Sequence, residues 1–411
     1  MTLPPSLAID VANARVRLDP RDPVFVQNPY AAYDAIRARC PAFFWEEYGF
    51  RCFAGHEDVS ALFRDRRFGR EILHVATRQE LGWPQPQQHT APFDRIDANS
   101  MLEREPPVHT RLRTLVNRAF VSRQIDRLRP RIAGLAYELI EGFAGKGEVE
   151  LIEAFATPIP VLVIAELLGV PAEMAPSLLD WSHRMVAMYQ FNRSRAVEEA
   201  AVAATEAFVD FLKGYVKERR TRPAEDLISH LIAVEAEGAK LSEDELISTC
   251  ILLLNAGHEA TVHAIGNGVK AILESDQAPG AIFCDVESAV EEVLRYDAPL
   301  HLFTRYALED VALAGGLVRK GEKIGLMLGA ANRDPARFEA PGAFRPQRQR
   351  APHMTFGGGI HFCVGAPLAR LELEVALPIL LERLPHLALA EPPRYADTYH
   401  FHGLERLMLR W

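Results

Sequence analysis

The stretch Phe356-Gly-Gly-Gly-Ile-His-Phe-Cys-Val-Gly365 places a single cysteine, Cys363, in a glycine-rich loop ahead of a predicted helix. Neighbouring glycines allow positive φ angles and let the backbone approach something bulky and flat. The N-terminus of the following helix directs its free N–H groups toward the sulfur. We therefore expect a lowered pKa of the Cys363 thiol and a stabilised thiolate.

Cys363 has two interpretations on this pattern alone. A lone free cysteine is most often a buried structural residue. A thiolate in such a loop is also a suitable soft ligand for heme iron, where it donates electron density that favours O–O cleavage. The loop by itself leaves both interpretations open.

The composition indicates a globular protein with a large core. The chain has 411 residues, 48% of them hydrophobic and 25% charged, and its length alone would suggest more than one domain. A formal net charge of −9 argues against nucleic-acid binding. The five cysteines are scattered without a CxxC pair, and the N-terminal segment resembles neither a membrane span nor a signal peptide. We expect a cytoplasmic enzyme without a membrane anchor.

Periodicity predicts a mainly α-helical chain with a minor β portion. Apolar residues recur at spacings of three and four through residues 107–294. A capping box at 242–245 opens the longest helix, and a last helix is expected from about 365 to 384. The other segments with a clear helical pattern are 125–143, 160–168, 197–218 and 226–235.

Strands are expected in two separate parts of the chain. Short strand-like pieces occur at 42–45 and 51–54, and glycine and proline turn signals punctuate the chain after Arg305. Residues 82–97 are polar, contain several prolines and lack helical periodicity, so we expect a long loop there.

Two further segments carry charged or polar groups at helical spacing. Glu292 and Arg295 lie three residues apart and can pair on one helical face, although most such pairs are solvated surface pairs. His109 and Arg113 lie four residues apart and would present two donors on one face. That arrangement suits a carboxylate, although two exposed polar residues are the simpler interpretation.

A fourth pattern, Leu254-Asn-Ala-Gly-His-Glu-Ala-Thr261, lies inside the most apolar predicted helix. A glycine in a helix interior costs about 1 kcal/mol. Gly257 is therefore expected to serve a close approach or a local distortion of the helix.

These four segments together resemble the cytochrome P450 family. Residues 356–365 are similar to the family's heme-binding loop FGxGxHxCxG at every fixed position, and the resemblance extends from about Asn28 to Trp411. It implies a heme-thiolate monooxygenase with heme b between the long central helix and the cysteine loop with its following helix. It also implies one domain over residues 1–411, with a β-rich subregion of N- and C-terminal pieces and a helical body at about 107–295 and 365–384.

The resemblance also assigns roles to individual residues. Cys363 would be the ligand to the iron, and Glu292 and Arg295 would form a buried structural pair completed by Arg348, since pairing offsets the desolvation of lone charges. The remaining heme contacts would come from His109, Arg113, Arg305, His361, Phe356 and Gly357.

The long helix departs from the family pattern at one position. That pattern, [Ala/Gly]-Gly-x-[Asp/Glu]-Thr, sets an acid and an alcohol beside bound dioxygen. Glu259 matches the acid and is carried over as the proton-relay acid, but Ala260 stands at the alcohol position. Glu259, Ala260 and Thr261 form the candidate catalytic segment. Thr261 lies about 100° further around the helix than Ala260, so it is expected to pack against other side chains or to hydrogen-bond to the backbone. Either a substrate hydroxyl or ordered water replaces the alcohol, or the enzyme loses much of its oxygen as peroxide.

Electrons are expected to come from a separate protein, because the resemblance leaves no length for a fused reductase. It implies a ferredoxin or flavodoxin reduced by NAD(P)H, and a monomeric enzyme. The candidate docking patch, whose members are equally well explained as solvated surface residues, comprises Arg104, Arg111, Arg118 and Arg370.

The substrate pocket is expected to be mainly apolar and aromatic, with a few polar donors. This lining fits a small-to-medium hydrophobic organic substrate without naming one. Besides the loop around 72–101, the expected contributors are Leu252, Ala256, Leu300, Leu302, Phe303 and Phe401, with His301, Thr304 and His400 as polar donors.

Three alternatives are open. Peroxide-dependent members of the superfamily usually carry Arg-Pro where this chain has Glu259-Ala260, which favours the dioxygen route. A non-oxygenase use of the fold, such as isomerisation or dehydration, is disfavoured by the retained acid. A heme-thiolate sensor is disfavoured by the lack of an output domain.

Overall fold

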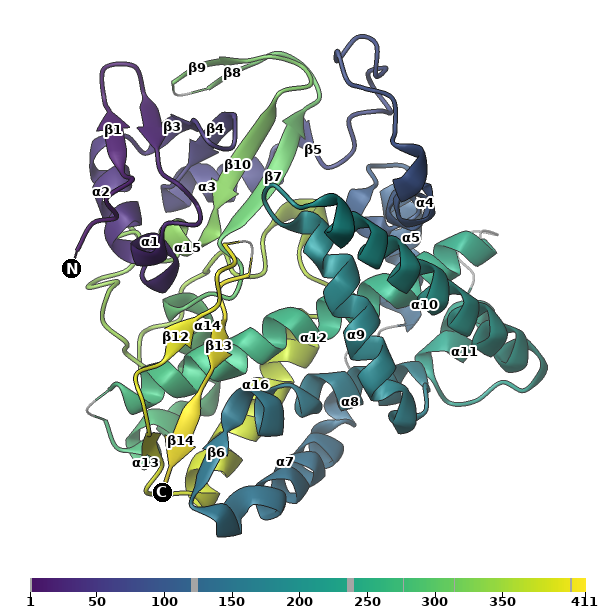
Figure 1. Ribbon diagram of the computed structural model, residues 1–411, viewed down its shortest axis with the longest axis vertical. Coiled ribbons are helices and arrows are strands. Elements are labelled where there is room, and N and C mark those ends of the chain that lie inside the picture. The colour runs from purple at the N-terminus through teal and green to yellow at the C-terminus, as the bar shows by residue number, and fades with distance from the viewer. Residues whose placement is uncertain (1, 120–124, 235–239, 276, 314, 400) are drawn as a thin grey trace.

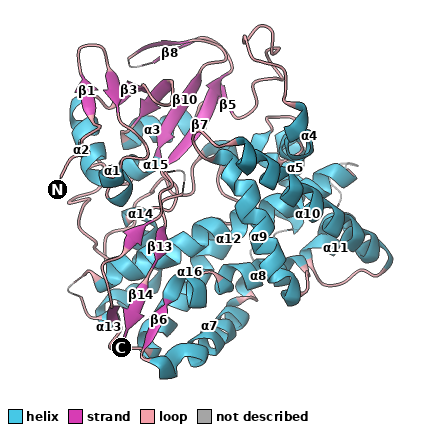
Figure 2. Ribbon diagram, viewed as in Figure 1, coloured by secondary structure: helices cyan, strands magenta, loops and turns pink. Residues whose placement is uncertain are grey.

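The structure is a computed structural model that describes residues 2–119, 125–234, 240–275, 277–313, 315–399 and 401–411. Helices fill most of the molecule, and strands gather mainly along one side, where the N-terminus also lies (Figures 1 and 2). The predicted architecture, mainly α with a minor β portion, is confirmed. No helix in the described part of the chain is both long and apolar enough to cross a bilayer.

The helices of the described residues vary from single turns to one of more than eight turns. In chain order they are α1 (Pro23–Gln27), α2 (Tyr30–Arg39), α3 (His56–Arg64), α4 (Ala91–Ala98), α5 (Val108–Ala119), α7 (Arg129–Phe143), α8 (Pro158–Leu168), α9 (Ala175–Val186), α10 (Arg195–Thr221), α11 (Leu227–Ala233), α12 (Glu243–Leu273), α13 (Pro279–Ile282), α14 (Val286–Tyr296), α15 (Leu328–Ala331) and α16 (Ala366–Arg383).

The largest sheet has the strand order β1-β2-β3-β4-β10-β7-β5. It joins distant parts of the chain, because β10 pairs in parallel with β4 and antiparallel with β7. Its strands are β1 (Ala8–Asp10), β2 (Arg15–Arg17), β3 (Ala42–Trp45), β4 (Phe50–Phe53), β5 (Phe68–Gly69), β7 (Leu302–Ala307) and β10 (Lys323–Met327).

The smaller sheets pair in the orders β11-β14-β6, β12-β13 and β8-β9. Two of them bring the C-terminal segment of the chain against the helical part of the molecule (Figure 1). Their strands are β6 (Glu148–Glu150), β8 (Val311–Leu313), β9 (Gly316–Val318), β11 (Ala388–Leu389), β12 (Arg394–Tyr395), β13 (Leu404–Arg406) and β14 (Met408–Arg410).

Helix α12 passes through the middle of the helical part (Figure 1) and packs against α8, α9, α14 and α16. The predicted capping box fixes its start, since Ser242 Oγ accepts from the Glu245 N–H and the Glu245 carboxylate accepts from the Ser242 N–H. A Cβ at Gly257 would lie 3.1 Å from Cγ1 of Ile164 on α8. The helix continues through Gly257, so this glycine serves close approach rather than distortion.

Two helix starts differ from the prediction, and in both cases a proline occupies the first turn of the helix. Residues 91–97, predicted as loop, belong to α4 with Pro92 in its first turn. The helix predicted at 125–143 is interrupted by a turn, and α7 begins only at Arg129 with Pro130 in its first turn. The first turn has no intrahelical N–H bonds to lose, so proline begins a helix there instead of preventing it.

The remaining predicted elements agree closely with the structure. Residues 42–45 form β3, and 51–54 correspond to β4 one residue earlier. Residues 160–168 and 197–218 lie within α8 and α10, which extend further at their ends. Residues 226–235 correspond to α11, whose N-cap is Asp226, and residue 235 lies outside the described residues. The helix predicted at 365–384 is α16.

Candidate functional site

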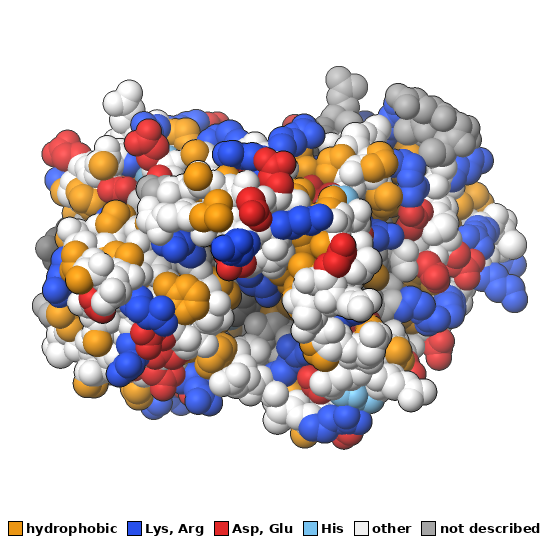
Figure 3. Space-filling view, turned by 90° about the horizontal axis from the view of Figure 1, so that it is seen from above, with side chains coloured by type: hydrophobic (Ala, Val, Ile, Leu, Met, Phe, Trp, Pro, Cys, Tyr) orange, Lys and Arg blue, Asp and Glu red, His pale blue; other side chains and the backbone are white. Residues whose placement is uncertain are grey.

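A cavity of about 890 Å³ lies between α12 and the loop that carries Cys363, with the start of α16 beside that loop. Residues of α4, α9 and β7 complete its largely apolar walls. Seen from above, the molecular surface is hollowed between the β-rich half and the helical half (Figure 3). The lining draws on both halves, for example on Tyr48 and Phe191, whose ring centroids lie 4.9 Å apart.

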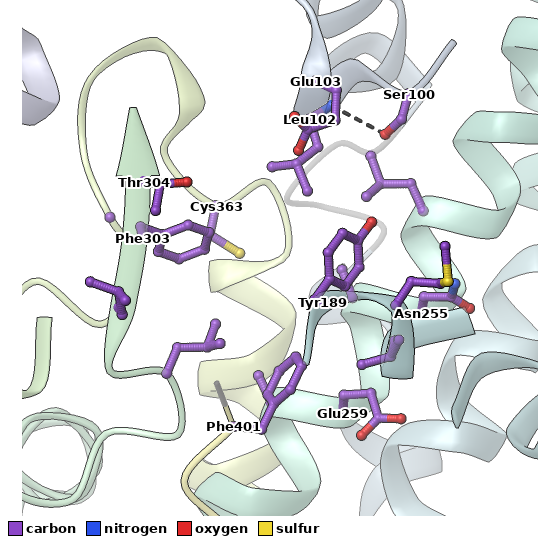
Figure 4. Close-up of a pocket in the computed structure, with 18 of the residues that line it drawn as sticks. Ser100, Leu102, Glu103, Tyr189, Asn255, Glu259, Phe303, Thr304, Cys363 and Phe401 are labelled. Carbon is purple, nitrogen blue, oxygen red and sulfur yellow. Dashed lines mark hydrogen bonds between the residues drawn. The ribbon is translucent and has the colours of Figure 1, made fainter. Parts of the chain in front are cut away.

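The cysteine loop is held tightly against α3. The φ angles of Gly357 and Gly359 are both 68°, in the left-handed region that favours glycine. A Cβ at Gly359 would lie 2.1 Å from the carbonyl oxygen of Phe63. Glycine is therefore required here by close approach to α3 rather than to the cavity. The loop directs the Cys363 sulfur into the cavity (Figure 4).

The predicted lowering of the Cys363 pKa is wrong for the polypeptide alone. Burial raises the pKa of the thiol, and the N–H groups of Gly365 and Ala366, together with Arg113, only oppose that rise. The contributions expected from the helix N-terminus are present, but the desolvation of a thiolate inside the protein outweighs them. A coordinated metal ion would add the missing positive charge, since it deprotonates a ligating thiol.

Among the described residues, Arg305 on β7 is a buried cation that pairs with no carboxylate. Its side chain lies in the cavity wall and the residue is 5% exposed. In the described part of the chain, its guanidinium donates to the Thr304 carbonyl oxygen and stacks over the Phe63 ring. Burial lowers the pKa of Arg305 to about 9. An anionic group in the cavity would offset this desolvation cost, and a heme propionate has that chemistry.

Helix α5 brings His109 and Arg113 to the same wall, one turn apart as predicted. Burial lowers the pKa of His109 to about 4, so this ring is neutral at neutral pH and acts as an N–H donor. Arg113 Nη1 donates to the Phe362 carbonyl oxygen over 2.7 Å. This bond joins α5 to the cysteine loop, and it holds the Arg113 guanidinium near the Cys363 sulfur.

Sequence reasoning missed Glu105. Its Oε1 lies 2.9 Å from His361 Nε2, and because a carboxylate only accepts, Nε2 is the donor. The same oxygen accepts from the Arg70 N–H over 2.7 Å. Burial acts to raise the pKa of Glu105, but His361 and Arg70 outweigh it and the net direction is downward. One signal was available, since Glu105 opens the segment that supplies His109.

The predicted cluster of Glu292 with two arginines is present behind the cysteine loop. Arg295 donates to both carboxylate oxygens of Glu292 over 2.7 and 2.8 Å, and Arg348 adds a third bond over 3.0 Å. Glu292 and Arg295 are each 2% exposed. Arg295 also donates to the carbonyl oxygens of Asn332 and Pro341, so the cluster fixes the chain between α14 and the loop that follows α15.

Glu259 faces three histidines. His183 Nε2 of α9 lies 3.2 Å and His258 Nε2 lies 3.5 Å from Glu259 Oε1, while His263 Nε2 lies 4.0 Å from Oε2. Burial acts to raise the pKa of Glu259, but His258, His183 and His263 outweigh it and lower the pKa overall. The carboxylate points away from Cys363 (Figure 4). The sequence identified the acid, but nothing local pointed to His183.

The two residues after Glu259 lie as expected. Ala260 lines the cavity. Thr261 also lines it, but its hydroxyl donates to the Gly257 carbonyl oxygen over 3.4 Å, which is the backbone bonding that the sequence predicted.

The substrate residues expected from the sequence reach the cavity with two exceptions. Leu252, Ala256, Leu300, Leu302, Phe303, Thr304 and Phe401 all line it. His301 does not, because its ring is fully buried behind the wall, where Nδ1 lies 2.8 Å from the Tyr33 hydroxyl. His400 lies outside the described residues.

Polar lining residues that the sequence did not single out are Tyr189, Asp97 and Asn255. The Tyr189 hydroxyl donates to Asp97 Oδ1 over 3.1 Å. Burial raises the pKa of Asp97 to about 7. Asn255 Oδ1 is buried and without a hydrogen-bond partner in the described residues. Tyr189 lies in the segment directly after α9, far in sequence from α12 and the cysteine loop.

The candidate docking patch is less positive than the sequence indicated. Arg104 pairs with Glu71, Arg111 with Glu245 and Arg370 with Glu291. Arg118, the fourth member, lies in the last turn of α5. Paired arginines present a weaker field than free ones, so the patch is a poorer steering surface than four isolated cations would be.

Comparison with known proteins identifies the class. The family model "Cytochrome P450" matches residues 286–395. The chain is 37% identical to the biotin biosynthesis cytochrome P450 of Bacillus subtilis over 93% of this chain and 96% of that protein. It is 36% identical to the cytochrome P450 monooxygenase PikC of Streptomyces venezuelae over 94% of this chain and 92% of that protein.

A solved structure of P450BioI in complex with an acyl carrier protein ligated to hexadec-9Z-enoic acid superimposes with a TM-score of 0.88 at 34% identity. The alignment covers 95% of this chain and 99% of that one. The fold and the thiol-lined cavity are thus those of a heme-thiolate enzyme. The chain belongs to the cytochrome P450 family, as a monooxygenase whose cofactor is heme b.

Proposed function

We propose that this chain inserts one oxygen atom of O2 into a small-to-medium hydrophobic organic substrate. The observation that carries the proposal is that one cavity is bounded by the Cys363 sulfur on one wall and by Glu259 and Ala260 of α12 on the other. The proposed heme ligand and the proposed proton-relay acid thus line one space that is large enough to hold a cofactor and a substrate.

The cavity residues fit heme b by their chemistry. Cys363 would ligate the iron, and Arg305, Arg113 and His109 would donate to the two propionates. His361, whose Nε2 donates to Glu105, would line the heme site without donating to a propionate. Phe356 and Gly357 in the cysteine loop would contact the macrocycle. When bound, the heme supplies the redox chemistry that activates oxygen.

The protein's own residues have three tasks in this proposal. The apolar wall that includes Leu252 and Phe303 excludes water from the reacting carbon. Glu259, whose lowered pKa keeps it ionised at neutral pH, accepts protons and passes them toward the cavity. The cluster of Glu292, Arg295 and Arg348 holds the backbone behind the cysteine loop in place, and it does not contact substrate.

The polar lining residues favour a substrate with at least one hydrogen-bonding group. Tyr189 with Asp97, and Asn255, whose Oδ1 has no hydrogen-bond partner in the described residues, lie among apolar side chains. A hydroxyl or an amide N–H on an otherwise hydrophobic molecule would satisfy Asn255 Oδ1, which only accepts. Because a structural relative was solved with a carrier-bound fatty acid, acids presented on an acyl carrier protein are one class to test.

Electrons are proposed to come from a separate ferredoxin or flavodoxin reduced by NAD(P)H. The three paired arginines of the docking patch imply weak electrostatic steering. Measuring the initial reduction rate with each partner at 50 and 300 mM salt checks this. A weak salt dependence is expected, and a steep one would contradict the interpretation.

The test has two stages. Substrates are first identified by ligand-induced changes in the heme absorption spectrum over hydrophobic compounds, free fatty acids and acyl-carrier-bound acids. Product is then collected under ¹⁸O2 with reductant. One labelled oxygen atom per product supports the proposal. Unlabelled product in peroxide alone would support a peroxide-dependent enzyme, and product without any oxidant would support an isomerase or dehydratase.

Cys363→Ser is the matched control for the cofactor assignment. The reduced, CO-treated wild type is expected to show the red-shifted absorption band of thiolate ligation, and the variant is expected to lack it. A serine hydroxyl is a poor thiolate substitute for iron. An unchanged band in a folded Cys363→Ser protein would rule out Cys363 as the ligand.

A further inference from the structure

The Glu259 carboxylate, which points away from Cys363 (Figure 4), belongs to a second cluster of donor atoms. His258 and Glu259 are neighbours on α12, and His183 lies on α9, which packs against α12. The three side chains offer one ligand atom each, and these atoms all lie within 4.8 Å of one another. His258 is 1% exposed and Glu259 is 7% exposed, whereas His183 connects the cluster to solvent because its side chain is 56% exposed.

The hydrogen bonding of His258 leaves two lone pairs facing each other. Its Nδ1 lies 2.8 Å from the Leu254 carbonyl oxygen, and because a carbonyl only accepts, Nδ1 carries the proton. In the neutral ring Nε2 therefore holds a lone pair, so this ring favours the ionised Glu259 carboxylate only when a proton or a metal ion sits at Nε2. Both His258 Nε2 and Glu259 Oε1 are buried and without a hydrogen-bond partner in the described residues. They lie 3.5 Å apart, so a positive charge between them would relieve a repulsion.

Two of the three ligand–ligand distances fit a tetrahedral metal ion, and the third, between the two imidazole nitrogens, is within 4.8 Å. Bonds of about 2.0–2.2 Å to nitrogen and oxygen place neighbouring ligands roughly 3.3–3.5 Å apart. Glu259 Oε1 lies 3.2 Å from His183 Nε2 and 3.5 Å from His258 Nε2. We propose that His183, His258 and Glu259 form a binding site for a divalent transition-metal ion such as Zn²⁺. Two imidazoles and one carboxylate leave the fourth position to water.

His263 is close to the cluster but lies outside this geometry, because its Nε2 is 4.0 Å from the other carboxylate oxygen. A second group of Asp297, His301 and His402 also brings donor atoms together. There the carboxylate oxygens already accept from the Tyr30 and Tyr395 hydroxyls. The Asp297 carboxylate is therefore satisfied by protein groups, whereas Glu259 Oε1 has no hydrogen-bond partner in the described residues.

Bound zinc would inhibit turnover, and this consequence rests on the proposed role of Glu259. The metal would occupy the carboxylate that is proposed to pass protons. It would also join α9 to α12, and residues at the end of α9, such as Met185 and Val186, line the cavity. The binding site itself does not depend on the activity, so the two ideas can fail separately.

The test is equilibrium dialysis of metal-free holoenzyme against ZnCl2, with bound zinc measured by elemental analysis. A partner that only orients a metal ligand is worth about 10–100-fold in affinity, so loss of a ligand is expected to weaken zinc binding at least about 10-fold. His183→Ala and Glu259→Gln should both show this loss. His74→Ala, which removes an exposed histidine elsewhere, should bind zinc as wild type does.

Two results would overturn the site. One is zinc binding in His183→Ala and Glu259→Gln with wild-type stoichiometry and affinity. The other is that wild type binds zinc only at sites that His183→Ala also has, with no additional site of higher affinity. Because His183 is exposed, its replacement should leave the fold intact, and the heme absorption spectrum checks this. Zinc inhibition of wild type that persists in His183→Ala would overturn the link to turnover.

Discussion

Arg348 Nε donates over 3.0 Å to Glu292 Oε2, the same oxygen that accepts from Arg295 Nε over 2.7 Å. Two cations thus share one buried carboxylate. A cluster of this kind contributes little net stability compared with apolar residues, but it is costly to break because a lone buried charge remains.

Glu292→Ala is therefore expected to destabilise the protein by about 3–5 kcal/mol, the usual cost of breaking a buried pair. The midpoint of urea unfolding measures this, and reduced heme content after expression should accompany it. Glu339→Ala is the control, since Glu339 pairs with Arg345 at an exposed position and surface pairs are worth about 0–1 kcal/mol. Equal losses in the two variants would contradict the special role of Glu292.

Arg305→Leu is expected to weaken heme retention by about 10-fold or more. A hydrogen bond to a charged group contributes about 1.5–3 kcal/mol, and Arg305 is a buried cation without a carboxylate in the described residues. The rate of heme transfer to excess apomyoglobin measures the effect. Arg319→Leu, at an exposed position, should release heme at the wild-type rate. A wild-type rate in Arg305→Leu would remove Arg305 from the set of heme contacts.

Gly359→Ala is expected to disrupt the cysteine loop. Its φ is 68°, which alanine rarely adopts. The Cβ of alanine would also lie 2.1 Å from the Phe63 carbonyl oxygen, so the loop would have to move. The expected result is a folded helical protein with low heme content, measured by circular dichroism and absorbance. Gly142→Ala, where a Cβ meets no atom within 4 Å, should leave heme content unchanged.

Ala260→Thr is expected to raise the yield of product per NAD(P)H consumed. Ala260 lines the cavity beside the acid, and threonine would supply the hydroxyl that the family pattern has there. Ala260→Val fills nearly the same volume without the hydroxyl and should not raise the yield. A wild type that is already well coupled, with a lower yield in Ala260→Thr, would show that substrate or ordered water replaces the alcohol.

Asp97→Asn is expected to change the pH dependence of stability. Burial raises the pKa of Asp97 from 3.8 to about 7, so the folded state binds this proton more tightly than the unfolded state. The contribution of Asp97 to stability therefore falls as pH rises from about 4 to 7 and stays low above 7. Removing the charge should raise the thermal midpoint more at pH 8 than at pH 5. An equal change at both values would contradict the raised pKa.

The sequence by itself determined the family and the identity of the key groups. The spacing of FGGGIHFCVG reflects local backbone needs in part, because positive φ at Gly357 and Gly359 and a helix starting after Gly365 are short-range properties. The close approach of Gly359 to Phe63 on α3 is a long-range contact. Pairing of Glu292 with Arg295 follows from helical spacing in the same way. Such features depend on neighbours in the chain, so the chain alone reveals them.

Only the tertiary structure decided which groups meet across the fold. Glu105 holds His361, and His183 reaches Glu259, through contacts between segments that lie far apart in the chain. Desolvation also depends on packing, which is why the Cys363 pKa rises where local dipoles alone predicted a fall. Burial and long-range contact are properties of the assembled core, and they set the charge, the partners and the accessible face of residues that the sequence can only name.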